Sequence, residues 1–162
     1  MKLRVWVVLS CLLAMVAYAD TSGAVPAPDF TLPSRAGKNI RLAELRGNII
    51  LLNFWASWCG PCREEMPKLE ALHQKYKDLG VKIVGVNLDT ERPQSEPLLK
   101  DTGVTFTILF DTEGKVGEMF KVETMPSTYL IDRDGRIRYV HRGYRPGYEN
   151  EYEAQIKALL RE

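Results

Sequence analysis

Two cysteines that lie three residues apart, Cys59 and Cys62, stand in the stretch WASWCGPCREEMP (55–67). A pair of thiols at this spacing can form a structural disulfide, supply part of a metal site or exchange a disulfide with another protein. The remaining cysteine, Cys11, lies inside an apolar run at the start of the chain. The residues and elements around the pair decide among these three chemistries.

The count of ligands argues against a metal site. Structural zinc takes four nitrogen or sulfur ligands, usually from two closely spaced pairs. The sequence has one such cysteine pair, and its two histidines, His73 and His141, lie far apart along the chain. We therefore expect neither a metal nor another cofactor, with a structural role for His73 and a surface position for His141.

The position of the pair favours exchange chemistry over an inert cross-link. A disulfide between Cys59 and Cys62 would close a very small loop, which limits its stabilising effect. Gly60 and Pro61 suit the first turn of a helix, so Cys59 should lie among unpaired N–H groups at the positive end of the helix dipole. Both effects favour the thiolate, which is the attacking species. Cys62, one turn later, is the expected resolving thiol.

Trp58 and Glu65 are the other side chains near the pair that are expected to take part. Trp58 would present a flat apolar surface to a docking partner, whereas Trp55 is expected in the core. Glu65 projects onto the apolar face of the following helix, and Glu64 points away from it. A buried carboxylate is costly unless it is protonated or paired, and burial would raise the pKa of Glu65 so that it could move protons to and from the thiols. The alternative is a Glu65 side chain that reaches solvent.

A buried strand and an amphipathic helix are predicted on either side of the cysteines. The continuous apolar run at 49–55 is typical of a central strand that is buried on both faces. After Pro61, apolar residues recur at spacings of three and four, which predicts a helix that ends before Gly80 and is kinked at Pro67. The recurring residues are Cys62, Met66, Leu69, Leu72, Tyr76 and Leu79.

The rest of the chain alternates strands with helices, which predicts an α/β fold with a mixed sheet. Strands are expected at 30–32, 39–42, 81–88, 105–110, 127–131 and 136–140. Helices are expected at 91–102, at 115–120 and at the end of the chain, where Tyr148, Tyr152, Ile156 and Leu159 share one face. One domain at 29–162 should follow a flexible lead-in at 20–28.

Residues 1–19 have the pattern of a secretory signal. Lys2 and Arg4 precede the apolar run 5–16, and an A-Y-A sequence that ends at Ala19 follows it. We expect cleavage after Ala19, because the run is shorter than the roughly 20 residues that span a bilayer; an uncleaved membrane anchor is the alternative. Export indicates an oxidising compartment. The net charge of +1 gives no reason to expect a nucleic acid partner.

The sequence resembles the thioredoxin superfamily, and its wider pattern is similar to the secreted TlpA/ResA-like branch, which includes the reductases of cytochrome c maturation. The similar stretches are APDFTL (27–32), LLNFWASWCGPCREEMPKL (51–69), VGVNLD (84–89) and MPSTYLIDRDGRI (125–137). The resemblance implies a thioredoxin fold, with a central mixed β-sheet flanked by helices, an N-terminal strand or hairpin extension and a central αβ insertion. It also implies a bacterial periplasmic location.

The resemblance further implies roles for individual residues. Cys59 matches the family's nucleophile and Cys62 its resolving cysteine, the two forming a redox disulfide. Pro126 stands at the position of the family's cis-proline, where the backbone of Met125 would pair with an extended substrate peptide. The expected substrate-binding residues are Trp58, Gly60, Pro61, Met125 and Pro126.

One position departs from ordinary thioredoxins, which carry a buried Asp six residues before the first cysteine. Here that position is Asn53, which cannot titrate. Proteins of the TlpA/ResA-like branch instead resemble one another in a Glu three residues after the second cysteine, and Glu65 stands there. The resemblance therefore implies a catalytic role for Glu65.

We expect an exported thiol–disulfide oxidoreductase that reduces disulfides in periplasmic client proteins, for example an apocytochrome c. The Gly-Pro spacer resembles that of reducing thioredoxins and not the Pro-His of the oxidant DsbA. A disulfide oxidase or isomerase is the alternative, followed by a copper-handling protein or a binding domain without turnover. A thiol peroxidase fits poorly, because that chemistry uses a lone cysteine in a different motif. The resemblance implies a membrane thiol carrier of the DsbD or CcdA type as electron donor, and we expect a monomer.

Overall fold

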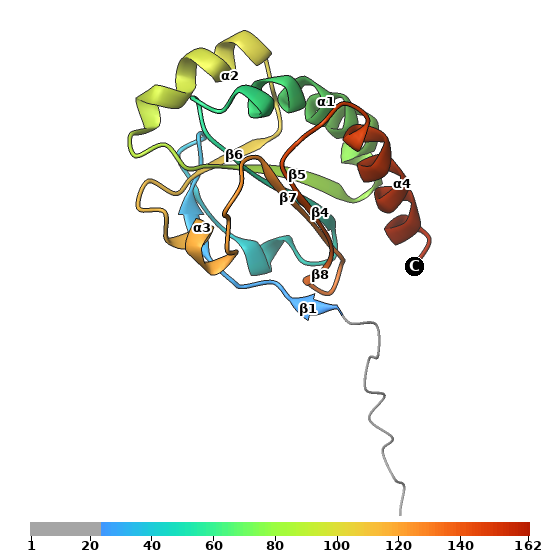
Figure 1. Cartoon of the computed structure of the whole chain (residues 1–162). Coiled ribbons are helices and arrows are strands. Elements are labelled where there is room, and N and C mark those ends of the chain that lie inside the picture. The colour runs from blue at the N-terminus through green and yellow to red at the C-terminus, as the bar shows by residue number, and fades with distance from the viewer. Residues whose placement is uncertain (1–23) are drawn as a thin grey trace, which may run out of the picture.

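A six-stranded mixed sheet forms the centre of the protein in the computed structural model, which describes residues 24–162 (Figure 1). Its strands, in spatial order, are β1 (Val25–Pro26), β8 (Arg136–Arg142), β7 (Ser127–Ile131), β4 (Ile49–Trp55), β5 (Val81–Asn87) and β6 (Thr107–Phe110). β4 runs parallel to β5 and antiparallel to β7. Before β4, a separate hairpin joins β2 (Thr31–Pro33) to β3 (Asn39–Arg41). The predicted α/β fold with a mixed sheet is confirmed.

Helices cover both faces of this sheet (Figure 1). One face is covered by α1 (Gly60–Tyr76), α2 (Glu96–Thr102) and α4 (Tyr148–Leu160). The other is covered by α3 (Lys115–Met119), the β2–β3 hairpin and the 3-10 helix η1 (Leu42–Leu45). Two more 3-10 turns are η2 (Lys77–Leu79), which follows α1, and η3 (Arg92–Ser95), which precedes α2. The helix expected over 91–102 is thus divided, because Pro93 and Pro97 each favour a separate helix start.

The strand β4 is buried along its whole length because the sheet is covered on both sides. Its side chains alternate between the two faces, and every one is at most 1% exposed. The α1 side holds Ile49, Leu51, Asn53 and Trp55, and the opposite side holds Ile50, Leu52 and Phe54. The predicted central strand is therefore confirmed, and Asn53 is its one polar side chain, directed at α1.

The helix α1 buries the face that the sequence predicts. Its buried residues are Cys62, Glu65, Met66, Leu69, Leu72 and Tyr76. The helix and its η2 extension end at Gly80, whose positive φ of 79° suits a glycine at a helix C-terminus. Pro67 lies inside α1, and the kink expected there stays a prediction.

The segment expected to be a flexible lead-in, 20–28, is in part a strand of the sheet. Val25 and Pro26 pair with Ile137 and Arg136 of β8. A two-residue strand is too short to show a periodic pattern, and proline is tolerated in it because β1 lies at the sheet edge. The prediction of a flexible lead-in is therefore wrong for these two residues.

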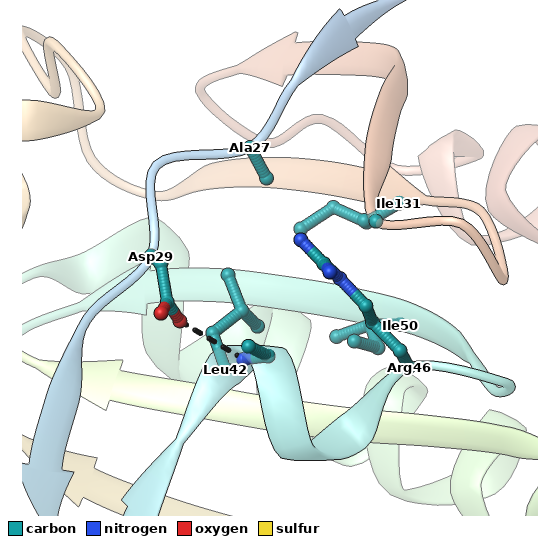
Figure 2. Close-up of a pocket in the computed structure, with 8 residues that line it drawn as sticks. Ala27, Asp29, Leu42, Arg46, Ile50 and Ile131 are labelled. Carbon is teal, nitrogen blue, oxygen red and sulfur yellow. Dashed lines mark hydrogen bonds between the residues drawn. The ribbon is translucent and has the colours of Figure 1, made fainter.

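Contacts from Asp29 fix the chain that follows β1. The Asp29 carboxylate accepts a hydrogen bond from the Ala43 N–H of η1 (3.0 Å) and forms an ion pair with Arg41 Nε (2.7 Å). The bond to Ala43 lies beside a small pocket against the sheet (Figure 2). The residues labelled around the pocket are Ala27, Asp29, Leu42, Arg46, Ile50 and Ile131.

The predicted signal sequence, 1–19, lies outside the residues that the structure describes. Within residues 24–162, none of the helices combines the length and the apolar character needed to cross a membrane.

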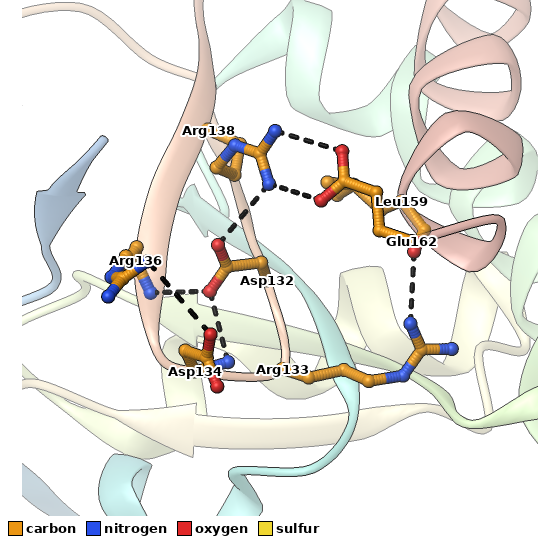
Figure 3. Close-up of polar contacts among 7 residues, drawn as sticks. All are labelled: Asp132, Arg133, Asp134, Arg136, Arg138, Leu159 and Glu162. Carbon is orange, nitrogen blue, oxygen red and sulfur yellow. Dashed lines mark hydrogen bonds and ion pairs between the residues drawn. The ribbon is translucent and has the colours of Figure 1, made fainter. Parts of the chain in front are cut away.

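Ion pairs and hydrogen bonds tie the end of α4 to the β7–β8 turn (Figure 3). Arg138 donates to both carboxylate oxygens of Glu162 (2.6 and 2.9 Å) and to Asp132 (3.4 Å). Arg133 donates to the backbone carbonyl of Leu159 (3.0 Å). We call Asp132, Arg133, Arg138 and Glu162 the C-terminal ion cluster.

Candidate active site

The two cysteines form a disulfide in the segment that joins β4 to α1. Cys59 caps the N-terminus of α1, and its Sγ accepts a hydrogen bond from the Cys62 N–H at 3.2 Å. Gly60 and Pro61 form the start of the helix. Cys59 keeps 5% of its surface exposed, whereas Cys62 is fully buried. Cys59 therefore lies at the helix end that carries unpaired N–H groups, with Cys62 behind it.

A buried carboxylate holds the loop that leads into Cys59. Asp89, which is 1% exposed, accepts hydrogen bonds from the Ser57 N–H (3.1 and 3.2 Å) and the Ser57 hydroxyl (3.0 Å). The Asn87 side-chain amide donates to the same carboxylate at 2.8 Å. Sequence reasoning missed this anchor, although Asn87 and Asp89 belong to the VGVNLD stretch. The bonds fix the backbone one residue before Trp58.

A groove of about 420 Å³ opens beside the disulfide. We call it the disulfide groove, and it is lined by Trp58, Cys59, Gly60, Pro61, Leu88, Val122, Glu123 and Met125. Trp58 is 71% exposed, so its ring is free to contact a partner. The Met125–Pro126 peptide bond is cis. Within residues 24–162 the backbone N–H and carbonyl of Met125 make no hydrogen bond, which leaves both available to an extended peptide.

Behind the disulfide, Glu65 is completely buried and surrounded by neutral hydrogen-bond donors. Tyr152 of α4 donates its hydroxyl proton to Glu65 Oε1 at 2.7 Å. Asn53 of β4 donates to Glu65 Oε2 at 2.8 Å, and the Thr128 hydroxyl of β7 lies 3.3 Å from Oε1. Asn53 also donates to Thr128 at 2.9 Å. We call Asn53, Glu65, Thr128 and Tyr152 the Glu65 cluster.

Burial and hydrogen bonding act in opposite directions on the Glu65 carboxyl. Burial disfavours the charged form and raises the pKa of Glu65 from an ordinary value of 4.5 to about 7. The hydrogen bonds from Tyr152, Asn53 and Thr128 lower this pKa, and the negative charge of Glu149 raises it. Burial has the larger effect, so Glu65 is able to gain or lose a proton near neutral pH.

Comparison with known proteins identifies the family. Residues 24–140 match the AhpC/TSA family. The chain belongs to the AhpC/TSA family. The thiol-disulfide oxidoreductase ResA of Geobacillus kaustophilus (strain HTA426) is 36% identical to this AhpC/TSA member over 146 residues, which cover 84% of each chain.

Solved structures agree with this assignment to the AhpC/TSA family. The crystal structure of a candidate thiol:disulfide interchange protein DsbE from Chlorobium tepidum matches with a TM-score of 0.81 at 39% identity, over 85% of this chain and 96% of that one. The solution structure of a candidate protein disulfide isomerase from Bacteroides thetaiotaomicron matches with a TM-score of 0.79 at 33% identity, over 85% and 89%. The predicted thioredoxin fold is confirmed, and the protein is a thiol–disulfide oxidoreductase.

In this AhpC/TSA member, His141 does not lie at the surface as the sequence suggested. Its side chain is 10% exposed and packs edge-on against the ring of Tyr152, with centroids 4.8 Å apart. Its Nε2 lies 2.9 Å from the side-chain oxygen of Gln155. The surface prediction is wrong because α4 covers this part of β8, a contact between segments that the local sequence does not reveal. His141 thus packs against the hydrogen-bond donor of Glu65.

Tyr152, Thr128 and Asp89 are the site residues that sequence reasoning did not find. The pattern of α4 places Tyr152 on its buried face, but only as an apolar residue. A buried tyrosine hydroxyl usually finds a hydrogen-bond partner, which is the one signal that could have pointed to its bond with Glu65. Within residues 24–162 of this AhpC/TSA member, no three His, Cys, Asp or Glu side chains gather as a metal site would require.

Proposed function

We propose that this thiol–disulfide oxidoreductase is an exported reductase that gives two electrons from its Cys59–Cys62 dithiol to disulfides of periplasmic client proteins. The observation that carries the proposal is the placement of the pair. Cys59 lies at a helix N-terminus and lines the disulfide groove, whereas Cys62 is buried behind it. The Cys59 sulfur, which borders the groove, can attack a docked client, and the fully buried Cys62 sulfur can resolve the product.

The proposed reaction has two exchange steps. The Cys59 thiolate attacks one sulfur of the client disulfide, and the other client sulfur leaves as a thiolate and takes up a proton. Cys62 then loses its proton and attacks the Cys59 sulfur, which releases the client as a dithiol and leaves the Cys59–Cys62 disulfide. The client has gained two electrons and two protons. A membrane thiol carrier of the DsbD or CcdA type would return them to the protein.

Glu65 is proposed as the group that accepts the proton of Cys62. It follows Cys62 by one helical turn, and helical side chains lean toward the N-terminus of their helix, which is the direction of Cys62. A carboxyl with a pKa of about 7 is suited to general acid–base work near neutral pH.

The direction of transfer is inferred from the surroundings of Cys59. Gly60 and Pro61 add no side-chain donor and no charge to the helix N-terminus, and the Cys62 N–H is the hydrogen-bond donor to Cys59 Sγ in the described residues. A strongly stabilised thiolate makes a protein oxidising, as in DsbA. We expect a reduction potential below about −200 mV, nearer thioredoxin at about −270 mV than DsbA at about −120 mV.

Equilibration of the purified protein with glutathione buffers of known ratio measures this potential, and reduction of insulin measures turnover. A potential near that of DsbA would replace the reductase with an oxidase or isomerase. Loss of insulin reduction together with stoichiometric copper binding would favour the copper-handling alternative. Intact mass of the exported protein tests cleavage after Ala19, and its mass in solution tests the expected monomer.

Two cysteine variants test the assigned roles and search for the client. Cys62→Ser should accumulate mixed disulfides with clients, because the bound Cys59 can no longer be resolved. Cys59→Ser should accumulate none and is the matched control. Mass spectrometry of the trapped complexes would name the client, for which an apocytochrome c is our candidate. Preferential alkylation of Cys62 at limiting reagent would reverse the assignment.

A further inference from the structure

The disulfide groove contains one acidic side chain. Eight residues line the groove. Seven of them carry no charge, since they are apolar residues, a glycine and the disulfide-bonded Cys59, and the eighth is Glu123. The Glu123 carboxylate stands in the segment that leads to Met125, and both residues line the groove. A peptide that pairs with the backbone of Met125 would therefore lie alongside this charge.

The charge of Glu123 is available to a partner. Glu123 is exposed, and within residues 24–162 its side chain has no hydrogen bond and no ion pair. Two other surface carboxylates, by contrast, are occupied by cations: Asp101 pairs with Arg63 at 2.7 Å, and Glu96 pairs with Arg35 at 2.8 Å. The groove thus presents an unpaired negative charge among apolar surfaces that include the exposed ring of Trp58.

We propose that Glu123 makes the disulfide groove selective for client segments that carry Lys or Arg next to the reacting cysteine. This inference rests on the proposed exchange reaction with client proteins. The Glu123 carboxylate would attract a basic side chain in the groove and repel an acidic one, and it would neither attract nor repel a neutral one. Since Glu123 is exposed, the preference is modest: about two- to fivefold in kcat/KM at low salt.

Three disulfide-bonded peptides test the proposal, identical except for Arg, Gln or Glu beside the attacked cysteine. The reduced protein is mixed with each peptide, and the second-order rate constant of peptide reduction is measured at low and high salt. The wild-type protein should reduce the Arg peptide fastest and the Glu peptide slowest, with the differences shrinking in high salt. Glu123→Gln should remove the differences, and Glu123→Lys should reverse the order.

Glu44→Gln is the matched control, because Glu44 is an exposed carboxylate of η1 that does not line the groove. It should keep the wild-type order. If the Gln peptide is reduced normally but Glu123→Gln keeps the wild-type order, the charge selectivity is overturned and the proposed function stands. If the wild-type protein reduces none of the peptides and no insulin, the proposed function fails and the selectivity with it.

Discussion

Two polar clusters join α4 to the sheet, and they differ in the burial of their acidic residue and in the charge of its hydrogen-bond donors. Near the start of the helix, Tyr152 reaches Glu65 in the Glu65 cluster, where the acid is completely buried and its donors are neutral. At the end of the helix, Glu162 meets Arg138 in the C-terminal ion cluster, where the glutamate side chain is 52% exposed and its partner is a cation.

The difference sets the charge behaviour of the two acids. The hydrogen bond from the Arg138 guanidinium lowers the pKa of Glu162, so this acid stays ionised throughout the neutral range. The pKa of Glu65 is raised to about 7 by burial, because its hydrogen-bond donors within residues 24–162 are neutral and only partly offset its desolvation. An acid paired with a cation serves to hold segments together. An acid buried among neutral donors can exchange a proton near neutrality.

The largest expected effect of breaking the buried cluster is on the rate of exchange. Glu65→Gln keeps the shape of the side chain but cannot carry a proton, so exchange should slow by up to the ~10²–10⁴-fold typical of general acid–base catalysis. Stopped-flow reduction of a model disulfide measures the rate, and circular dichroism checks the fold. Glu64→Gln, the exposed neighbour on α1, is the control. Equal rates for wild type and Glu65→Gln would remove Glu65 from the mechanism.

The same variant should change how stability depends on pH. The pKa of Glu65 in the folded state lies above its value in the unfolded state. Its contribution to the free energy of unfolding is therefore fully present below about pH 4.5 and is lost as pH rises through about 7. Relative to Glu65→Gln, the oxidised wild-type protein should lose about 2–3 kcal/mol of unfolding free energy between pH 5 and pH 8. Urea titrations across this range measure the difference, and parallel curves would contradict a raised pKa.

Removing one donor of the buried cluster should have a smaller effect. Tyr152→Phe deletes the hydroxyl that stabilises the ionised carboxylate, so the pKa of Glu65 should rise above about 7. The exchange rate of the wild-type protein should change with pH as Glu65 titrates, a step that Glu65→Gln lacks, and in Tyr152→Phe this step should move to higher pH. The lost hydrogen bond should also lower the free energy of unfolding by about 1 kcal/mol. Tyr148→Phe, on the same helix, is the control. An unmoved profile would show that Tyr152 only packs.

The smallest effect is expected at the C-terminal ion cluster. Glu162→Gln removes an exposed ion pair and should cost less than about 1 kcal/mol, with the cost shrinking as salt is added. The exchange rate and its pH profile should match wild type. A change in that profile would mean that the two ends of α4 are coupled, which would break the distinction drawn between the clusters.

Elements with a strong local pattern could be predicted from the sequence. The apolar run predicted β4, and the three- and four-residue spacing of apolar residues predicted α1. The same spacing placed Glu65 on the buried face of α1. The helix start at Gly60 and Pro61 likewise predicted the position of Cys59. In each case the information lies within a few turns of chain, where periodicity and proline chemistry act.

Features that depend on contacts between distant segments could not be predicted. Asn53 was noticed as a replacement for a titrating residue, but its bond to Glu65 depends on how α1 crosses β4. The hydroxyl of Tyr152 and the burial of His141 depend on where α4 lies on the sheet. The strand β1 depends on a partner more than a hundred residues later in the chain.

The pairing of β1 with the start of β8, and the bond between Arg138 and Glu162, place both ends of the described chain at the same end of the sheet. This arrangement determines where a tag can be attached. Residue 24 and Glu162 both lie at the end of the sheet where β4 begins, whereas Cys59 follows the other end of that seven-residue strand, roughly 20 Å away. A C-terminal tag fixed to a sensor chip therefore leaves the disulfide groove facing the solution. Surface-based binding measurements on immobilised protein should report client docking without steric interference from the support.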